Sequence, residues 1–259
     1  MTFDNEGKGS ERSESLGGLA KGLRIIECFS ESVPMLTVSQ AARAVSISPA
    51  SARRCLLTMH ELGYLSYDGK FFRPTPRMRR LGGAYTGSTP LPLLAEPHLR
   101  AVRDALDESA SLAVLDGDQV SFIARAESQR IVTMNVRLGG RLPAHMSSSG
   151  RVLLAAQSDE QIEELLRTAR FDSTGPNTLT SAEQVMDRIR QVRADGAAIT
   201  DEELEPGVRT VAVPVRDSSG FLQAALSLAV SAARVSVDEL REHHVPVMQR
   251  EAALLGQSI

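Results

Sequence analysis

The segment Thr37–Leu65 carries hydroxyl and basic side chains at a spacing that suits contact with duplex DNA. Guanidinium forks fit guanine edges and phosphate groups, and serine hydroxyls can bond to either. From Met35 to Arg80 the chain has eight basic and two acidic side chains, so this stretch carries a net charge of +6. Phosphate neutralisation supplies most of the affinity of DNA-binding proteins, so this charge predicts DNA binding. The predicted contacts are Ser48, Ala50, Ser51, Arg53 and Arg54 on one predicted helix, and Lys70 and Arg73, which suit phosphates, on a following hairpin.

Two short predicted helices would position these side chains. Apolar residues at helical spacing begin at Val38, and a second helix is predicted to start at Pro49. Ser48 can cap the second helix, Pro49 suits its first turn, and Gly63 is typical of a helix end. Two helices joined by so short a turn form a helix-turn-helix, here at about 38–57, and the second helix of such a motif enters the major groove.

A β-hairpin follows the two helices. Residues 64–67 and 70–73 alternate like strands, and Asp68-Gly69 between them is a strong turn signal. An amphipathic helix predicted from Ser15 to Phe29 would complete the core beneath the recognition helix. Together these elements predict a winged helix-turn-helix domain at residues 15–77. The alternative is a pair of helices with a solvated basic face, since charge runs alone usually indicate one.

A second group of hydroxyl side chains, Ser147, Ser148 and Ser149, precedes Gly150 at the start of a predicted helix. Backbone N–H groups and the helix dipole at such a start favour a carboxylate, and three hydroxyls add donors. The simpler alternative is a helix cap with a hydrogen-bonded serine cluster, which is the more common arrangement. The residues by themselves leave both interpretations open.

The composition is that of an ordinary globular protein long enough for two domains. The chain has 259 residues, of which 42% are hydrophobic and 24% charged, and its net charge is −3. Because residues 35–80 carry +6, the remaining residues carry −9, which favours two modules with different partners. Cys28 and Cys55 lie in apolar patterns without metal-like spacing. With no membrane-spanning run and no signal-peptide core, we expect a cytoplasmic protein.

The rest of the chain contains both strand and helix patterns. Residues 1–14 are polar and aperiodic, which predicts a disordered arm, and the prolines of TPLPLLAEP mark a boundary within a linker at 78–109. This linker includes a helix predicted from His98 to Ser109, and strand pairs at both ends of 91–259 predict an α+β sheet domain. The predicted strands are 112–115, 120–124, 131–136, 208–215 and 221–230. Capping boxes predict helix starts at Ser158 with Gln161, Thr180 with Glu183, and Ser236 with Glu239, the last opening one helix to about Leu255.

Five stretches of the chain carry a resemblance to a known family. They are KGLRIIECF, ARRCLLTMHELGYL, RLPAHMSSSGRVLLA, DEELEPGVRTVAVPV and GFLQAALSLAV. Over nearly its full length the chain resembles the IclR family of bacterial transcriptional regulators, and RIVTMNVRLGGRLPAHMSSSGRVLLA is similar to the group that controls the β-ketoadipate pathway and its feeder routes. The resemblance implies a winged helix-turn-helix head, a linker helix, a GAF-like α/β effector-binding domain, and homodimers, often paired into tetramers, on palindromic operators. The effectors of that group are small aromatic acids such as protocatechuate or 4-hydroxybenzoate.

The resemblance also implies which residues hold the effector. They are Ile131, Met134, Leu142, Ser147, Ser148, Ser149, Thr200, Thr210, Ser227 and Ala229. Family members of the glyoxylate pathway have more polar groups where this chain has Thr200 and Ala229, so a larger or more apolar ligand is expected here. Arg125, Arg137 or Arg141 could pair with the ligand's carboxylate, and the sequence does not choose among them.

The sequence alone leaves other classes of protein open. A hydrolase using the serine run would need a Gly-x-Ser-x-Gly elbow, which is absent, and the acidic stretch 201–205 is interpreted as a solvated loop. The histidines at 98, 145, 243 and 244 match no zinc-ligand spacing, so we predict no catalytic residue, metal ion or cofactor. A DNA-binding head with a domain used only for dimerisation, or a regulator that responds to a glyoxylate- or pyruvate-like acid, are the remaining alternatives.

Overall fold

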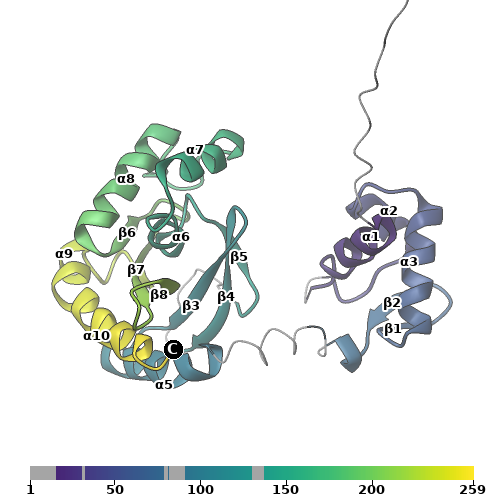
Figure 1. Cartoon of the computed structure of the whole chain (residues 1–259), viewed down its shortest axis with the longest axis horizontal. Helices are drawn as coiled ribbons and strands as arrows, with labels where there is room; N and C mark the ends of the chain where they lie inside the picture. The colour runs from purple at the N-terminus through teal and green to yellow at the C-terminus, as the bar shows by residue number, and fades with distance from the viewer. Residues whose placement is uncertain (1–15, 31–32, 79–80, 82–90, 130–136) are drawn as a thin grey trace, which may run out of the picture. The chain divides into compact units, whose positions relative to one another are not determined.

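The chain forms two compact units, Met1–Ser88 and Thr89–Ile259 (Figure 1). The computed structural model describes residues 16–30, 33–78, 81, 91–129 and 137–259. The arm predicted at 1–14 and the strand predicted at 131–136 therefore lie outside the described residues.

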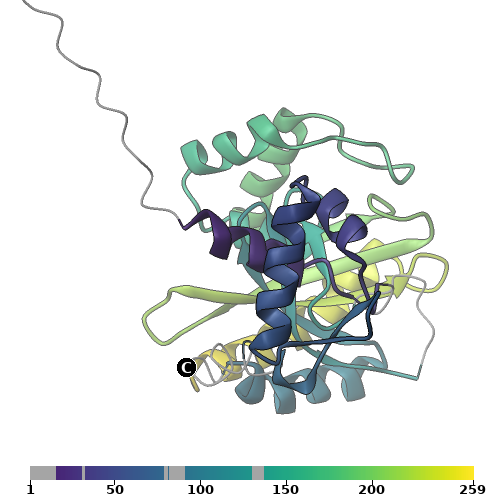
Figure 2. The same ribbon diagram turned by 90° about the vertical axis from the view of Figure 1, so that its right-hand side faces the viewer.

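Three helices form the hydrophobic core of the first unit (Figure 2). They are α1 (Gly17–Ile26), α2 (Val38–Ala44) and α3 (Pro49–Glu61). Ile25 of α1, Ala41 of α2 and Leu56 of α3 are completely buried, and all three belong to this core. The apolar residues whose spacing predicted these helices therefore form the face of each helix that packs inward.

The turn between α2 and α3 has the predicted cap. Ser48 precedes α3, and its Oγ accepts a hydrogen bond from the N–H of Ser51 at 3.3 Å, with Pro49 in the first turn. Ser46, two residues earlier, has φ of 53°, a left-handed conformation that favours glycine. Thr37 and Gln40 form a capping box at the start of α2, and this box was not predicted.

A small antiparallel sheet follows α3 and has the shape of a wing. Its strands are β1 (Leu65–Tyr67) and β2 (Phe72–Pro74), and a short 3-10 helix, η1 (Pro76–Met78), comes after them. Asp68 Oδ1 accepts hydrogen bonds from the backbone N–H groups of Lys70 and Phe71 and so holds the predicted turn. Leu36 bridges to Phe72 through two backbone hydrogen bonds of 3.0 and 2.8 Å, which ties the segment before α2 to the wing.

The second unit is built on one antiparallel sheet with the strand order β5-β4-β3-β8-β7-β6. The strands are β3 (Ala110–Asp116), β4 (Gln119–Ala126), β5 (Arg141–Pro143), β6 (Ala198–Asp201), β7 (Val208–Arg216) and β8 (Leu222–Ser231). Both faces of the sheet are apolar, and each is covered by helices, which explains why β7 and β8 read as almost continuous apolar runs. The α+β class predicted from the sequence is confirmed.

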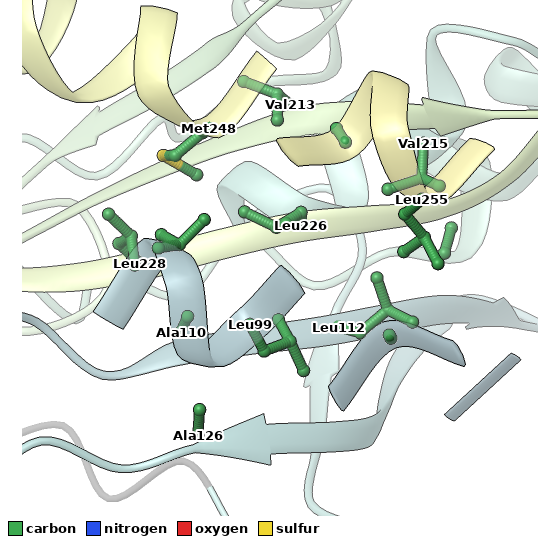
Figure 3. Packing of buried hydrophobic residues seen from close by; sticks show 14 of the residues in the cluster. Leu99, Ala110, Leu112, Ala126, Val213, Val215, Leu226, Leu228, Met248 and Leu255 are labelled. Carbon is green, nitrogen blue, oxygen red and sulfur yellow. The ribbon is translucent and has the colours of Figure 1, made fainter. Parts of the chain in front are cut away.

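One face of the sheet is covered by α5 (Leu91–Leu106) and α10 (Val245–Gly256). Leu99 of α5 lies over Leu112 and Leu226, and Met248 and Leu255 of α10 lie over β7 (Figure 3). The helix predicted from His98 in fact begins at Leu91 and runs through Pro97. The stretch that contains the prolines does begin at the boundary between the two units, at Thr89, but the prolines do not delay the helix. Pro92 lies in the first turn, and the burial of the helix against the sheet offsets Pro97.

The other face is covered by α6 (Ser148–Leu154), α7 (Asp159–Thr168) and α8 (Ala182–Asp195). The capping box at Ser158 is confirmed, whereas the predicted cap of α8 was wrong by one residue. Ser181 caps α8, and the N–H of Thr180 instead donates to the Gln184 side chain at 2.9 Å. Ser181 with Gln184 fits the capping-box pattern as well as Thr180 with Glu183 does. The sequence therefore allowed two start positions for this helix.

The predicted last helix is not continuous. Ser236 caps it as predicted, but it divides into α9 (Val237–Glu239), a π-helical turn η2 (Leu240–His244), and α10. Pro246 lies at the start of α10 and lacks the N–H that a regular helix would need there, which accounts for the wider turn before it.

Candidate functional site

The exposed face of α3 carries the two arginines predicted to contact DNA. Arg53 and Arg54 are both exposed, and neither has a hydrogen-bonding or ion-pairing partner among the described residues. Ser48 and Ala50 are exposed at the start of the same helix, and Ser51 is half-buried. This face of α3 is therefore exposed to solvent and positively charged. The short side chains at the start of the helix would allow a nucleic-acid backbone to approach closely.

The wing carries the other two predicted DNA contacts, and they differ in their surroundings. The ammonium of Lys70 lies 5.2 Å from the centre of the Phe71 ring and is exposed. Arg73 donates from Nη1 to Asp68 Oδ2 at 2.6 Å, so its charge is already paired. Hydrogen bonds from the N–H groups of Phe71 and Lys70, and then from Arg73, lower the pKa of Asp68 to about 2.

A cavity lies between α6 and the sheet in the second unit. The space in it that a water-sized molecule can occupy is about 20 Å³, which is room for about one water molecule. Its described lining residues are Ser111, Phe122, Arg125, Leu142, Ser147, Ser148, Ser149, Thr210, Ser227, Leu228 and Ala229. The walls thus combine apolar side chains with several hydroxyls and one guanidinium, which is the usual make-up of a small-molecule site.

Most of the residues predicted to hold an effector lie in this lining. They are Leu142, Ser147, Ser148, Ser149, Thr210, Ser227 and Ala229. Thr200 lies behind the wall, where it is 1% exposed and shares a hydrogen bond of 2.6 Å with Thr210. Ile131 and Met134 lie outside the described residues.

Two of the three serines are engaged within the protein. Ser147 caps α6, because its Oγ accepts a hydrogen bond from the N–H of Gly150 at 3.1 Å. Ser148 Oγ accepts from Thr210 Oγ1 at 2.7 Å, which links α6 to β7. Ser149 has no hydrogen-bonding partner among the described residues. The segment is therefore a capped serine cluster, as the simpler interpretation predicts, and its three serines also line a cavity.

Arg125 is the member of the lining that the sequence could name only as one of three candidates. It donates from Nη1 to Ser111 Oγ at 2.9 Å and from Nε to Glu127 Oε1 at 3.3 Å. Arg141, by contrast, pairs with Asp116 at 2.8 Å, and its side chain is 44% exposed outside the cavity lining. Ser111, Phe122 and Leu228 were not predicted, because nothing in the alternation of their strands marks them as cavity residues.

A β-bulge explains why Arg125 reaches the cavity. The pairing of β3 with β4 runs from Leu112 opposite Ala124 to Ala113 opposite Phe122, so Ile123 is an extra residue. Phe122 therefore belongs to the face covered by α6, while Ala124 belongs to the face covered by α5. Without the extra residue, the side chain three positions after Phe122 would point to the opposite face.

A buried ion pair anchors α6 beside the cavity. Arg151 donates from Nη1 and Nη2 to the two oxygens of Glu203 at 3.1 and 2.5 Å, and from Nε to the carbonyl of His145 at 3.0 Å. The expectation that the acidic stretch 201–205 is solvated is therefore wrong for Glu203, which is 5% exposed. Burial is the main reason that the pKa of the His145 ring is lowered.

Gly150 allows α6 to approach the preceding turn. A Cβ atom built at Gly150 would lie 2.0 Å from the carbonyl oxygen of Ala144, so no other residue fits without movement of the backbone. The cavity wall thus depends on this close contact as well as on the ion pair.

Within the described ranges, no group of three or more histidine, cysteine or acidic residues is placed to hold a metal ion. The same ranges contain no helix with the length and apolar character needed to cross a bilayer.

Two family models match the chain. The model of the IclR helix-turn-helix domain matches residues 18–69, and the model described as bacterial transcriptional regulator IclR C-terminal matches residues 83–254. The first match covers the three helices and the first strand of the wing, β1, and the second covers the sheet unit with its cavity.

Individual relatives agree with these matches. The Pca regulon regulatory protein of Pseudomonas putida is 40% identical over 231 residues, which are 89% of this chain and 79% of that protein. The p-hydroxybenzoate hydroxylase transcriptional activator of Acinetobacter baylyi is 32% identical over 242 residues, 92% of this chain and 89% of that protein. An IclR homolog of Microbacterium hydrocarbonoxydans, crystallised in complex with 4-hydroxybenzoate, has a TM-score of 0.80 and 28% identity and covers 92% of this chain and 97% of its own.

The matched models and the named relatives are transcriptional regulators, not enzymes, which settles the choice that the serine run had left open. The similarity to the group identified from the sequence is also confirmed, since the first of these relatives is a Pca regulon regulator. The chain belongs to the IclR family of bacterial transcriptional regulators, and its helix-turn-helix binds DNA.

Proposed function

We propose that this protein regulates transcription in response to a small aromatic acid that binds in the cavity between α6 and the sheet. The observation that carries the proposal is the lining itself, where apolar walls meet a guanidinium and several hydroxyls. A structurally similar IclR homolog was crystallised with 4-hydroxybenzoate, a ligand of this chemistry. The effector contacts include the seven predicted residues of the lining, with Thr200 positioning Thr210 and with Ile131 and Met134 as the resemblance implies.

The helix-turn-helix unit contacts both the bases and the phosphates of DNA in this proposal. The start of α3, from Ser48 through Arg54, enters the major groove, where Arg53 and Arg54 can reach base edges or phosphates. Lys70 and Arg73 of the wing contact phosphates. Arg73 would then share its guanidinium between a phosphate and Asp68.

A homodimer on a palindromic operator is the assembly that we propose, with pairing of dimers into tetramers as a further step. Leu19 and Leu23 of α1, with Leu16 just before it, form an exposed apolar stripe, and their exposed fractions are 62, 48 and 75%. Such a stripe at helical spacing supports burial against a second copy. The protein would act on its operators in the cytoplasm.

The narrowness of the cavity supports control by the ligand. Because there is room for about one water molecule, an aromatic ring can enter only if the walls move apart. Such a ligand would bind the expanded form of the domain and shift the population towards it.

The cavity wall is also part of the core that carries α5. Leu228 lines the cavity and belongs to the hydrophobic cluster beneath α5, together with Leu99 and Val102. A change in the wall is therefore transmitted through one sheet to the helix at the start of the second unit. Coupling of this kind is reciprocal, so operator binding should change effector affinity by the same factor.

The test is calorimetry of the full chain with a panel of aromatic and short-chain acids, followed by operator gel shifts with and without each ligand that binds. We expect an aromatic acid to bind, to raise the unfolding midpoint and to change operator affinity. Binding of glyoxylate or pyruvate, with no aromatic acid bound, would contradict the proposed effector class. Turnover of a bound acid would contradict the assignment of the cavity as a purely regulatory site.

A further inference from the structure

The bulge at Ile123 gives the cavity its charge. Among the described lining residues, Arg125 alone has an ionised side chain, and it faces the cavity because the extra residue reverses the alternation of β4. Its side chain is 16% exposed, so the charge is largely removed from water. Its anionic partner among the described residues is Glu127, at 3.3 Å from Nε, and the Glu127 side chain is 75% exposed. A water-screened carboxylate of this kind compensates a largely buried cation only in part, so a second anion inside the cavity would be stabilised.

We propose that Arg125 receives the carboxylate of the effector, and that the hydroxyl groups at the far end of the cavity receive the ligand's second polar substituent. This assignment rests on the proposed function and adds the orientation of the ligand. The geometry of Arg125 suits the role, because Nη1 and Nε are held by Ser111 and Glu127 while Nη2 donates to none of the described residues. A guanidinium fixed in this way has one edge available for a carboxylate.

The serine segment offers less to an anion. The hydroxyl of Ser147 caps its own helix and that of Ser148 accepts from Thr210, so both are engaged within the protein. The helix α6 has only seven residues, which limits its dipole. The hydroxyls of Ser149, Ser148 and Thr210 can each donate or accept a hydrogen bond. They therefore suit a neutral hydroxyl on the ligand, which also both donates and accepts.

The two ends of the cavity are separated by the width of the sheet between them. Arg125 lies on β4 and Thr210 on β7, with β3 and β8 between. Three strand spacings of about 4.8 Å place the outer strands roughly 14 Å apart. The long arginine side chain spans part of this distance. Once the walls have moved apart, the remainder can hold one ring and its substituents against the apolar lining, which includes Phe122 and Leu142.

The ligand class follows from this arrangement. It is a planar monoanionic acid with the carboxylate on one side of a ring and a hydroxyl on the other. An uncharged amide of the same shape should bind much more weakly to the wild-type chain, since it cannot neutralise Arg125. The preference for acid over amide therefore reports on the Arg125 end, and the preference for a hydroxylated ring reports on the Ser149 end.

The experiment is calorimetry of the full-length chain with 4-hydroxybenzoate, 4-hydroxybenzamide and benzoate. Arg125→Gln should lose at least about tenfold in affinity for the acid, the scale of a charge-assisted hydrogen bond, with little change for the amide. Arg125→Lys should recover part of the affinity for the acid, because it restores the charge without the fork. Arg141→Gln is the matched control, since Arg141 is paired with Asp116 outside the lining, and it should bind the acid as the wild type does.

Ser149→Ala examines the other end of the cavity, and retained binding of the amide by Arg125→Gln shows that this variant is folded. Ser149→Ala should reduce the preference for 4-hydroxybenzoate over benzoate and leave the preference for acid over amide intact. The assignment fails if Arg125→Gln binds the acid as tightly as the wild type, or if Ser149→Ala rather than Arg125→Gln removes the preference for the acid. If the wild type binds none of the three compounds and no other aromatic acid of the panel, the proposed function fails as well, and the two failures are thereby distinguished.

Discussion

Arg151 and Glu203 face each other in a bidentate ion pair that joins α6 to the loop after β6. Their side chains are only 1 and 6% exposed, and the oxygen–nitrogen distances are 3.1 and 2.5 Å. The backbone carbonyl of Glu203 also accepts hydrogen bonds from Thr174 and Thr178, so the loop 172–179 is tied to the same point. One ion pair thus holds three segments around the cavity.

Replacing one member of this pair should strongly destabilise the second unit. Glu203→Gln leaves the Arg151 charge buried without its counter-ion, and we expect a loss of about 3–5 kcal/mol in the free energy of unfolding. Chemical denaturation of the full chain measures it. Arg167→Met is the control, because it breaks an exposed ion pair with Glu164 within α7, where we expect about 0–0.5 kcal/mol. Equal effects of the two variants would contradict the importance of the buried pair.

The contact at Gly150 should be intolerant of a single methyl group. In Gly150→Ala the new Cβ would meet the Ala144 carbonyl oxygen at 2.0 Å, so α6 must move away from the turn that precedes it. We expect a loss of about 1–3 kcal/mol from overpacking, together with loss of effector binding in calorimetry. Gly22→Ala in α1, where nothing lies within 4 Å, should instead stabilise the head by about 0.5–1 kcal/mol.

The turn of the helix-turn-helix stores a small amount of backbone strain at Ser46. Its φ of 53° is left-handed, so Ser46→Gly should relieve strain and raise the unfolding midpoint of the head. The net gain should be about 0.5–1 kcal/mol, because the greater freedom of glycine in the unfolded chain offsets part of it. Ser46→Val should have the opposite sign, since a β-branched side chain fits this conformation poorly. Thermal melts of the three proteins rank them directly.

The free guanidinium of Arg53 should be required for operator binding. Removing it in Arg53→Ala should weaken operator affinity by more than about tenfold, the scale of one good base contact. Gel shifts at fixed salt measure the change, with Arg167→Met, which removes a positive charge outside the head, as the comparison. Wild-type affinity in Arg53→Ala would take this residue out of the interface.

The wing should lose stability in acid through Asp68. The pKa of this carboxyl is lowered from 3.8 to about 2 by backbone N–H groups and Arg73, so the folded state favours the ionised form. Its contribution is therefore fully present above pH 3.8 and is lost as the pH falls through about 2. Asp68→Asn should flatten the dependence of the unfolding midpoint on pH in that window. An identical profile for the two proteins would show that another carboxyl is responsible.

Local chemistry made the head largely predictable. The serine before Pro49, the glycine after the helix and the Asp-Gly turn each act within a few residues, and each has the predicted role. The bridge between Leu36 and Phe72 was not predicted, because it joins backbone groups far apart in the sequence and depends on no particular side chain.

The cavity was only partly predictable, for a related reason. The serine segment is contiguous and carried its own signal, but Arg125 reaches the same space through a bulge that shifts pairing by one residue. Nothing in the local pattern of β4 marks Ile123 as the extra residue. Likewise, the sequence does not distinguish Glu203 from the neighbouring acidic residues, and only the fold brings it to Arg151. The positions of Arg125 and Glu203 both depend on contacts between segments that are far apart in the sequence.

The helix α5 has a practical consequence for any fragment of this protein. Leu91, Ala95, Leu99 and Val102 are each at most 4% exposed because they cover one face of the sheet. A recombinant ligand-binding fragment that begins after α5 would present that face to solvent, and we expect it to aggregate. The helix between the head and the first long strand is therefore as much a part of the sensor as the cavity, and cloning boundaries must lie before Leu91.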